Sequence, residues 1–168
     1  MLTALFVGLG SIGTRHLKNL KQLAPGGVAV HALRSDLSRP LRDGVEPLLD
    51  RQFTSLSKGQ EHYDIAFITN PTSLHAETLL QLKGRADTLF IEKPIFSAQQ
   101  TELDLARLLP PGQKAYVAAP MRWCGTMLAL KEELPRLKPY SARVICSSYL
   151  PDWRPGVDYR TVYSAHKA

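Results

Sequence analysis

Cysteine is scarce in this sequence: among 168 residues there are only Cys124 and Cys146. They lie far apart, in neither metal-ligand nor redox-motif spacing, which argues against a metal site or dithiol centre built on them. The pattern predicts reduced thiols in a cytoplasmic protein, with a disulfide between the two as the minor alternative.

Long apolar runs are also lacking. None approaches the about 20 residues of a membrane-spanning helix, and the amino terminus does not combine a basic segment with the long apolar core of a signal peptide. The sequence shows no internal repeat and no low-complexity tract. With 44% hydrophobic and 21% charged residues, its composition is typical of a globular domain without a membrane partner.

Clustered positive charge is missing as well, although the net charge is +6. The basic residues are scattered over a helix, a loop and a turn: Arg15, Lys18, Lys21, Arg34, Arg39, Arg42, Arg136 and Lys138. No basic run alternates with aromatic residues, which argues against a nucleic-acid partner. A solvated surface, or attraction for an anionic cofactor, explains the excess more simply.

The most informative pattern that is present lies near the amino terminus. Gly8, Gly10 and Gly13 follow the apolar run Leu5-Phe6-Val7 and precede a helical pattern. In a strand–turn–helix of this kind, the first glycine permits the tight turn, the second lets a diphosphate approach and the third lets helix and strand pack closely. Because the positive end of the helix attracts phosphate, the segment predicts a dinucleotide site.

Alternating strand and helix patterns continue to residue 119. Strands are predicted at 3–8, 28–33, 65–69, 88–91 and 116–119, and helices at 12–23, 74–82 and 98–109. Pro25-Gly26-Gly27 ends the first helix, and Ser97 with Gln100 forms a capping-box pattern for the third. The stretch 34–61 is predicted as loop with at most a short helix at 45–49. This order indicates an α/β fold of the Rossmann type, a doubly wound parallel sheet.

The pattern changes after Pro120. A helix is predicted at 126–134 and a strand at 141–149, and an irregular aromatic-rich tail begins at Pro151. We therefore expect a dinucleotide-binding domain at 1–120 and, at 121–168, the truncated beginning of a second α+β domain. One strand cannot bury its own apolar face, so the tail is expected to be disordered, folded back or paired in a homo-oligomer.

The end of the second predicted strand bears on cofactor choice. An acidic residue there binds the ribose hydroxyls of NAD, whereas this chain has Arg34 and Ser35. A guanidinium and a hydroxyl suit a 2′-phosphate, which favours NADP. The alternative is NAD, with Arg34 in solvent and Asp36 binding the ribose.

Three motifs in order carry a family resemblance: the glycine turn, Asn70-Pro71 followed by His75, and Glu92-Lys93-Pro94 after the next strand. Together they resemble the Gfo/Idh/MocA family of NAD(P)-dependent oxidoreductases, which includes glucose–fructose oxidoreductase and inositol dehydrogenase. Residues 147–167 also look like members that act in sugar metabolism for cell-surface polysaccharides. The resemblance implies a sugar or sugar derivative as substrate and no metal.

The resemblance also implies roles for individual residues. The diphosphate group would be held by Gly8, Gly10, Ser11, Ile12 and Gly13, and the adenosine ribose by Arg34 and Ser35. The adenine and ribose side of the cleft would be formed by Thr69, Asn70, Pro71 and His75. Near the nicotinamide would lie Glu92, Lys93 and Pro94, and Arg122 would make a further contact. Lys93 would be catalytic, because an ammonium beside a cationic ring in a closed cleft releases its proton more easily.

Simpler interpretations stay open for several of these residues. Lys93 could be a solvated charge, His75 a capping or packing residue, and Arg122 the partner of a carboxylate. The aromatic residues Trp123, Trp153, Tyr159 and Tyr163 could pack in a core rather than bind sugar.

Family members are about twice as long as this chain, and their second domain completes the substrate site. The resemblance therefore predicts a fragment that binds cofactor with little or no turnover by itself. A non-catalytic dinucleotide sensor or scaffold is the alternative, although such a protein has no need of Lys93. An S-adenosylmethionine-dependent methyltransferase would likewise have no use for the Glu-Lys-Pro motif.

Overall fold

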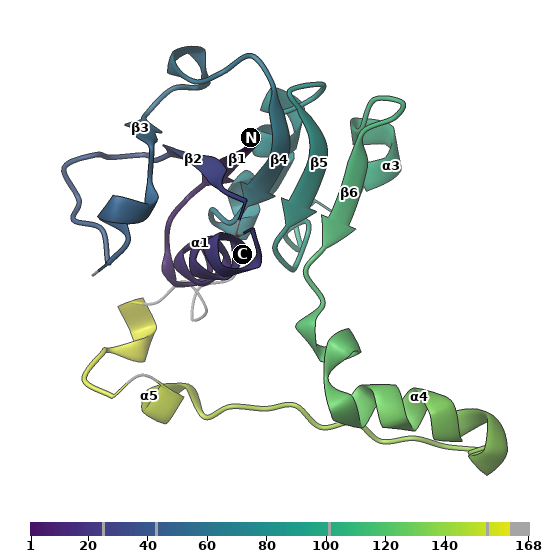
Figure 1. Ribbon diagram of the computed structural model, residues 1–168. Helices are drawn as coiled ribbons and strands as arrows, with labels where there is room; N and C mark the ends of the chain where they lie inside the picture. Colours follow the sequence, from purple (N-terminus) through teal and green to yellow (C-terminus); the bar gives the residue numbers. More distant parts are fainter. Residues whose placement is uncertain (25, 43, 101, 154, 162–168) are drawn as a thin grey trace. The chain divides into compact units, whose positions relative to one another are not determined.

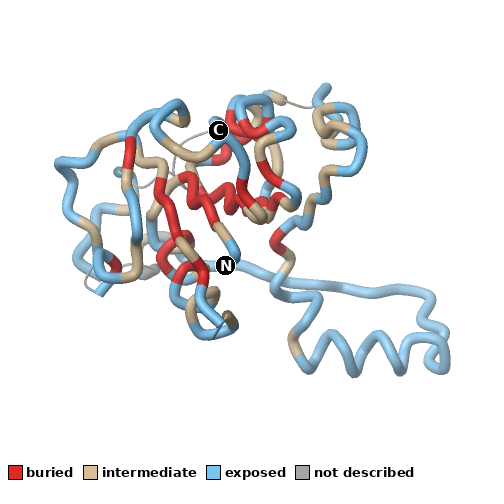
Figure 2. The backbone as a smooth tube through the Cα atoms, turned by 45° about the horizontal axis from the view of Figure 1, so that its top comes forward, coloured by how far each residue is buried: buried red, intermediate tan, exposed pale blue. Residues whose placement is uncertain are grey.

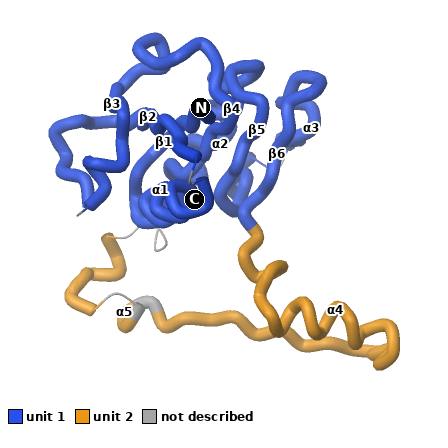
Figure 3. The backbone as a smooth tube through the Cα atoms, viewed as in Figure 1, with its two compact units in different colours: residues 1–118 blue, residues 119–168 orange. Residues whose placement is uncertain are grey.

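The computed structural model describes residues 1–24, 26–42, 44–100, 102–153 and 155–161. The chain divides into two compact units, Met1–Ala118 and Ala119–Ala168 (Figure 3).

The first unit is built on a six-stranded, fully parallel sheet with the order β3-β2-β1-β4-β5-β6 (Figure 1). The strands are β1 Leu2–Val7, β2 Val28–Leu33, β3 Arg51–Phe53, β4 Tyr63–Ile68, β5 Ala86–Ile91 and β6 Lys114–Val117. The strand order reverses between β1 and β4, which is where a doubly wound sheet opens a crevice for a ligand. This arrangement confirms the predicted Rossmann-type α/β fold.

Hydrophobic cores cover both faces of the sheet, and the buried backbone follows its central strands (Figure 2). On one face Leu17 of helix α1, Ser11–Leu23, packs with Phe6 and Phe67, whose rings stack at 4.4 Å. On the other face Leu79 of helix α2, His75–Gln81, lies in the second cluster. Since neighbouring residues of a strand point to opposite faces, apolar residues along β1, β4 and β5 feed both cores.

Short elements connect the strands. The 3₁₀ turns η1 Glu46–Leu48, η2 Leu56–Lys58 and η3 Thr72–Leu74 lie in the first unit, together with the one-turn helix α3 Leu105–Leu108. The stretch predicted as loop at 34–61 therefore contains η1 as expected, but it also contains the edge strand β3, which the sequence analysis missed. That strand has three residues, and two of them, Arg51 and Gln52, are polar.

The predicted helix 98–109 is wrong over most of its length. The backbone N–H of Ser97 does donate to Oε1 of Gln100 at 3.0 Å, as in a capping box. Among the described residues of this stretch, helix nevertheless forms only at α3, where the side chain of Asp104 accepts a bond from the Ala106 N–H. Between 98 and 104 the only large apolar side chain is Leu103, so a longer helix would have had no apolar face to bury.

The second unit contains η4 Pro120–Trp123, α4 Gly125–Leu137, α5 Leu150–Trp153 and η5 Tyr159–Thr161. Helix α4 includes the whole of the helix predicted at 126–134 and extends beyond it at both ends. The predicted strand at 141–149 is wrong: these residues form no strand within the described parts of the chain. A β-rich composition does not make a strand where no neighbouring strand satisfies its backbone groups. The tail residues Arg154 and Tyr163 lie outside the described residues.

No helix in the described ranges combines the length and the apolar character that crossing a bilayer requires.

Candidate functional site

The glycine turn joins β1 to α1, and each of its three glycines meets a different demand. Gly8 has φ +88°, and a Cβ there would lie 3.0 Å from the backbone N and Cα of Asn70. A Cβ on Gly13 would lie 2.5 Å from the carbonyl oxygen of Gly8 and 2.7 Å from Oγ1 of Thr69. At Gly10 a Cβ would meet nothing within 4 Å. The turn is therefore tight at Gly8, closely packed at Gly13 and open at Gly10.

The amino end of α1 is electropositive and available. Gly10 is its N-cap residue, and within the described residues no side chain caps this end and no acidic side chain lies in its first turn. The first intrahelical bond runs from the N–H of Thr14 to the carbonyl of Gly10, at 3.0 Å. The N–H groups of Ser11, Ile12 and Gly13 precede this bond, so they have no intrahelical acceptor and suit an anion.

Thr69 and Asn70 follow β4 and close the turn from the other side. The Thr69 hydroxyl lies 2.6 Å from the carbonyl oxygen of Gly8 and 3.1 Å from that of Val7, and it donates to them. The Asn70 amide donates to Oγ1 of Thr78 at 2.8 Å. Pro71 then leads into η3.

Two buried oxygens in this region lack a hydrogen-bond partner among the described residues: Oδ1 of Asn70 and Oγ1 of Thr14. Buried polar atoms are nearly always paired in folded proteins, so an unpaired amide oxygen and an unpaired hydroxyl beside an open glycine turn fit a site whose ligand supplies their partners. Together with the free amides of α1, they are what a dinucleotide would need here. The residues present therefore fit the cofactor that the glycine pattern predicts.

His75 lies inside the protein, with 1% of its surface exposed. Its Nδ1 is 3.1 Å from the carbonyl oxygen of Ile95, and its Nε2 is 3.0 Å from that of Asn70. Both ring nitrogens thus face backbone carbonyls, and a neutral ring can donate to one of them at a time. This placement ties the Asn70 turn to the loop after Pro94.

The Glu-Lys-Pro segment follows β5, beside the Asn70 turn that follows β4. Glu92 is 9% exposed, its N–H donates to the carbonyl of Ile68, and the Lys93–Pro94 peptide bond is cis. Lys93 is exposed. Since parallel strands end at the same edge, the lysine is at the edge of the sheet where the glycine turn lies.

The Glu92 carboxylate is held by His16 of α1, whose Nε2 lies 2.7 Å from Oε1. Burial acts to raise the pKa of Glu92, but the His16 hydrogen bond and the positive charges of His16 and Lys93 outweigh it, so the pKa is lowered. His16 was not among the residues predicted from the sequence. One signal was there: it lies one helical turn after Gly13, which points it toward the same sheet.

Arg34 and Ser35 follow β2. The Arg34 guanidinium donates to Oε1 of Gln52 at 2.8 Å and to the carbonyl of Arg39, while Ser35 is exposed. The carboxylate of Asp36 accepts from the N–H and hydroxyl of Ser38 at 2.8 and 2.6 Å, and these bonds lower its pKa. Asp36, the alternative residue for binding the ribose of NAD, thus already makes hydrogen bonds within its own turn.

The predicted site residues fall into two groups. The first unit carries all of them except Arg122, which lies in η4 of the second unit and is exposed. Among the described residues, no group of three or more His, Cys, Asp or Glu side chains is arranged to hold a metal ion.

A family model described as the oxidoreductase family with an NAD-binding Rossmann fold, Gfo/Idh/MocA, matches residues 2–114. The chain belongs to this family. The match confirms the resemblance drawn from the three motifs, and it covers the glycine turn, the Asn70 turn and the Glu-Lys-Pro segment.

Solved structures of similar fold include WlbA (WbpB) dehydrogenase from Thermus thermophilus in complex with NAD and α-ketoglutarate, at 28% identity and TM-score 0.61 over 81% of this chain. Two others are myo-inositol 2-dehydrogenase from Lactobacillus plantarum, at 22% and 0.67 over 82%, and WlbA dehydrogenase from Bordetella pertussis in complex with NADH and UDP-GlcNAcA, at 17% and 0.66 over 80%. The chain spans 47%, 42% and 42% of these proteins, respectively. No curated protein matches the sequence.

Proposed function

We propose that the first unit is the cofactor-binding part of an NAD(P)-dependent oxidoreductase that acts on a sugar or sugar derivative. The observation that carries this proposal is the open, uncapped amino end of α1 at Gly10, on the same sheet edge as the exposed Lys93. A helix end of this kind binds a diphosphate through backbone amides, and the far half of the cofactor would then lie along the sheet edge that carries the lysine.

In this proposal the amides of Ser11, Ile12 and Gly13 bind the diphosphate, and Gly10 leaves room for it. Thr69, Asn70 and Pro71 form the wall beside the riboses, and His75 holds that wall through the Asn70 carbonyl. When bound, the nicotinamide ring supplies hydride transfer.

Lys93 is the catalytic residue of the proposal. Its Nζ would hydrogen-bond to the nicotinamide ribose and to the substrate hydroxyl: as the neutral amine it would take up the proton of that hydroxyl, and as the ammonium it would return the proton in the reverse direction. Glu92 and Pro94 set the course of the backbone on either side of it.

The substrate class rests on the relatives. WlbA structures hold UDP-GlcNAcA, and an inositol dehydrogenase shares the fold. Both point to a ring bearing hydroxyl groups. We assign the cofactor domain to 1–120 and the beginning of the substrate domain to 121–168, where Arg122 would contact cofactor or substrate. Because the chain spans less than half of these relatives, we expect cofactor binding with little turnover.

We further propose a preference for NADP over NAD. Arg34, Arg39 and Arg42 line one open hollow after β2, and Arg42 also lines a second hollow beside Ser11 and Thr14 of α1. Arg34 has five N–H donors, of which the bonds to Gln52 and Arg39 use two. The remaining donors can bind a 2′-phosphate, while Oδ1 of Asp36 accepts from Ser38 and Oδ2 lies 3.5 Å from Nε of Arg39.

Fluorescence titration of the purified chain with NADPH, NADH and S-adenosylmethionine tests these proposals. We expect saturable binding of both reduced nicotinamide cofactors, tighter for NADPH, and none of S-adenosylmethionine. Failure to bind either nicotinamide cofactor would overturn the proposed function. Equal affinity for the two would overturn only the NADP preference.

A further inference from the structure

A partly buried polar pair links α1 to the segment after β5. Nε2 of His16 and Oε1 of Glu92 are 2.7 Å apart, although the residues are 76 positions apart in the sequence. Their side chains are 18% and 12% exposed. A hydrogen bond to an ionised group in such partly dry surroundings is among the stronger ones in proteins.

Aromatic neighbours fix the direction of the His16 ring. The ring meets Phe90 edge-on with centroids 5.0 Å apart, and it lies 6.1 Å from Phe67. Phe90 precedes Glu92 by two residues, so the strand that orients the imidazole also carries the carboxylate. The ring cannot turn away from Glu92 without losing this packing.

The second carboxylate oxygen of Glu92 reaches onward to Lys93. Oε2 accepts the backbone N–H of Lys93 at 3.2 Å. One carboxylate thus bridges the helix that presents amides to the diphosphate and the backbone of the exposed lysine. The ionised form suits both bonds, because it accepts at each oxygen.

We infer that His16 is a positioning residue: by holding the Glu92 carboxylate it fixes the backbone at Lys93 and so couples the diphosphate-binding helix to the nicotinamide side of the site. The effect on cofactor binding rests on the proposed function. The effect on the Lys93 backbone does not, because it follows from the two bonds of Glu92.

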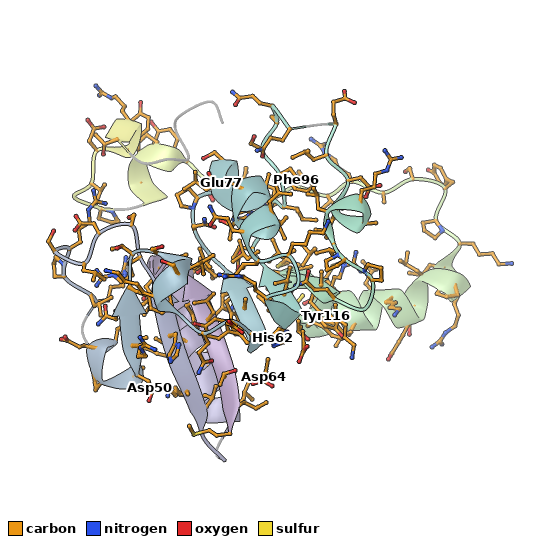
Figure 4. All side chains as sticks on the ribbon, turned by 90° about the horizontal axis from the view of Figure 1, so that it is seen from above. Asp50, His62, Asp64, Glu77, Phe96 and Tyr116 are labelled. Atoms are coloured by element: carbon orange, nitrogen blue, oxygen red, sulfur yellow. The ribbon has the colours of Figure 1, made fainter. Side chains whose placement is uncertain are left out.

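Two amide substitutions separate this role from simple packing. The Nε2 atoms of glutamine and histidine are the same number of bonds from Cα, so His16→Gln can still donate to Glu92. His16→Asn is shorter by one methylene and cannot reach it, yet it remains polar. His62, labelled in Figure 4, provides the control: it precedes β4 and therefore lies at the opposite end of the parallel sheet from Glu92, which follows β5. In the described residues it pairs only with Asp87, at 3.4 Å.

The first measurement is hydrogen exchange at the Lys93 amide, followed by NMR in the chain without cofactor. We expect His16→Asn to speed exchange about tenfold, because the carboxylate is no longer held. His16→Gln and His62→Asn should change it less than threefold. Unchanged exchange in His16→Asn would overturn the inference whatever the cofactor results.

The second measurement compares NADH with ADP, which contains the diphosphate and the adenosine ribose but neither the nicotinamide nor its ribose. We expect His16→Asn to weaken NADH binding about tenfold and ADP binding less than threefold, and His16→Gln to retain wild-type affinity for both. An equal loss for the two ligands would show a merely structural role and overturn the inference. If the wild-type chain binds neither ligand, the proposed function fails, and Lys93 exchange still decides the role of His16.

Discussion

The substitution Gly10→Asp is expected to stabilise the fold and, at the same time, to weaken diphosphate binding. Gly10 is the N-cap residue of α1, its φ is −69° and a Cβ there meets nothing within 4 Å. An aspartate therefore fits without strain, and it is among the favoured N-cap residues. Its carboxylate can accept the free amides of the first turn and interact favourably with the helix dipole.

The size of both effects follows from this geometry. Replacing an N-cap glycine by aspartate should stabilise the domain by about 0.5–1 kcal/mol, which raises Tm by roughly 1–4 °C for a chain of this length. The same carboxylate takes the place of the phosphate. At about 4 Å from one phosphate charge and an effective dielectric constant of about 20, repulsion costs about 4 kcal/mol, or about a thousandfold in Kd.

The assay combines thermal unfolding with NADPH fluorescence titration, and Gly26→Asp is the control. Gly26 also has open space around its Cβ position, so this variant adds the same charge elsewhere in the first unit and should bind normally. The reasoning would be refuted if Gly10→Asp were more stable than the wild type and still bound NADPH within tenfold of it. A destabilised Gly10→Asp would contradict the assignment of Gly10 as an unstrained N-cap.

Three further predictions address other parts of the first unit. Gly13→Ala should destabilise the fold by about 1–3 kcal/mol in urea titration, because its Cβ would lie 2.5 Å from the Gly8 carbonyl oxygen; an unchanged midpoint would contradict the close packing of α1 on β1. Burial first, and then the charge of Arg51, lowers the pKa of His31, so the unfolded chain binds its proton more readily and stability should fall as pH drops below about 6.5 toward the folded pKa. The urea midpoint should depend on pH less strongly in His31→Leu than in the wild type. An equal pH dependence in the two proteins would refute the assignment of this effect to His31. Arg34→Gln should weaken NADPH about tenfold more than NADH in fluorescence titration, while Arg107→Gln, an exposed site paired with Asp104, should leave the ratio unchanged; an unaltered ratio in Arg34→Gln would argue against the 2′-phosphate role.

The parts of the fold that the sequence predicted are those whose cause is local. Gly8, Gly10 and Gly13 each meet a backbone or spacing requirement of the turn. The strands β2 and β4 are mostly apolar segments of strand length, interrupted by His31 and Asp64. Burial on both faces explains why such runs lack alternation. The type of these elements could be predicted from such signals. The predicted strand ends differ from the observed ones by a residue or two, because hydrogen bonding to neighbouring strands decides where pairing stops.

The errors came from elements whose cause lies elsewhere in the chain. β3 has one apolar residue, Phe53, and exists because β2 offers an edge: His31, Ala32 and Leu33 pair with it in register. Conversely, 141–149 has the composition of a strand, but in the described structure it has no partner. Strand formation depends on a neighbour that composition does not reveal.

The candidate site likewise has one part that could be predicted from local sequence and one part that could not. The backbone amides of α1 are a property of one helix end, so the motif predicted them. The link from His16 through Glu92 to Lys93 depends on the approach of two elements that the chain order separates by 76 residues. A histidine after the glycine turn and a glutamate before the lysine are each ordinary in isolation. The two side chains can form a hydrogen bond only because the parallel order β1-β4-β5 brings α1 over the end of β5. The placement of Lys93 therefore follows from the topology of the sheet.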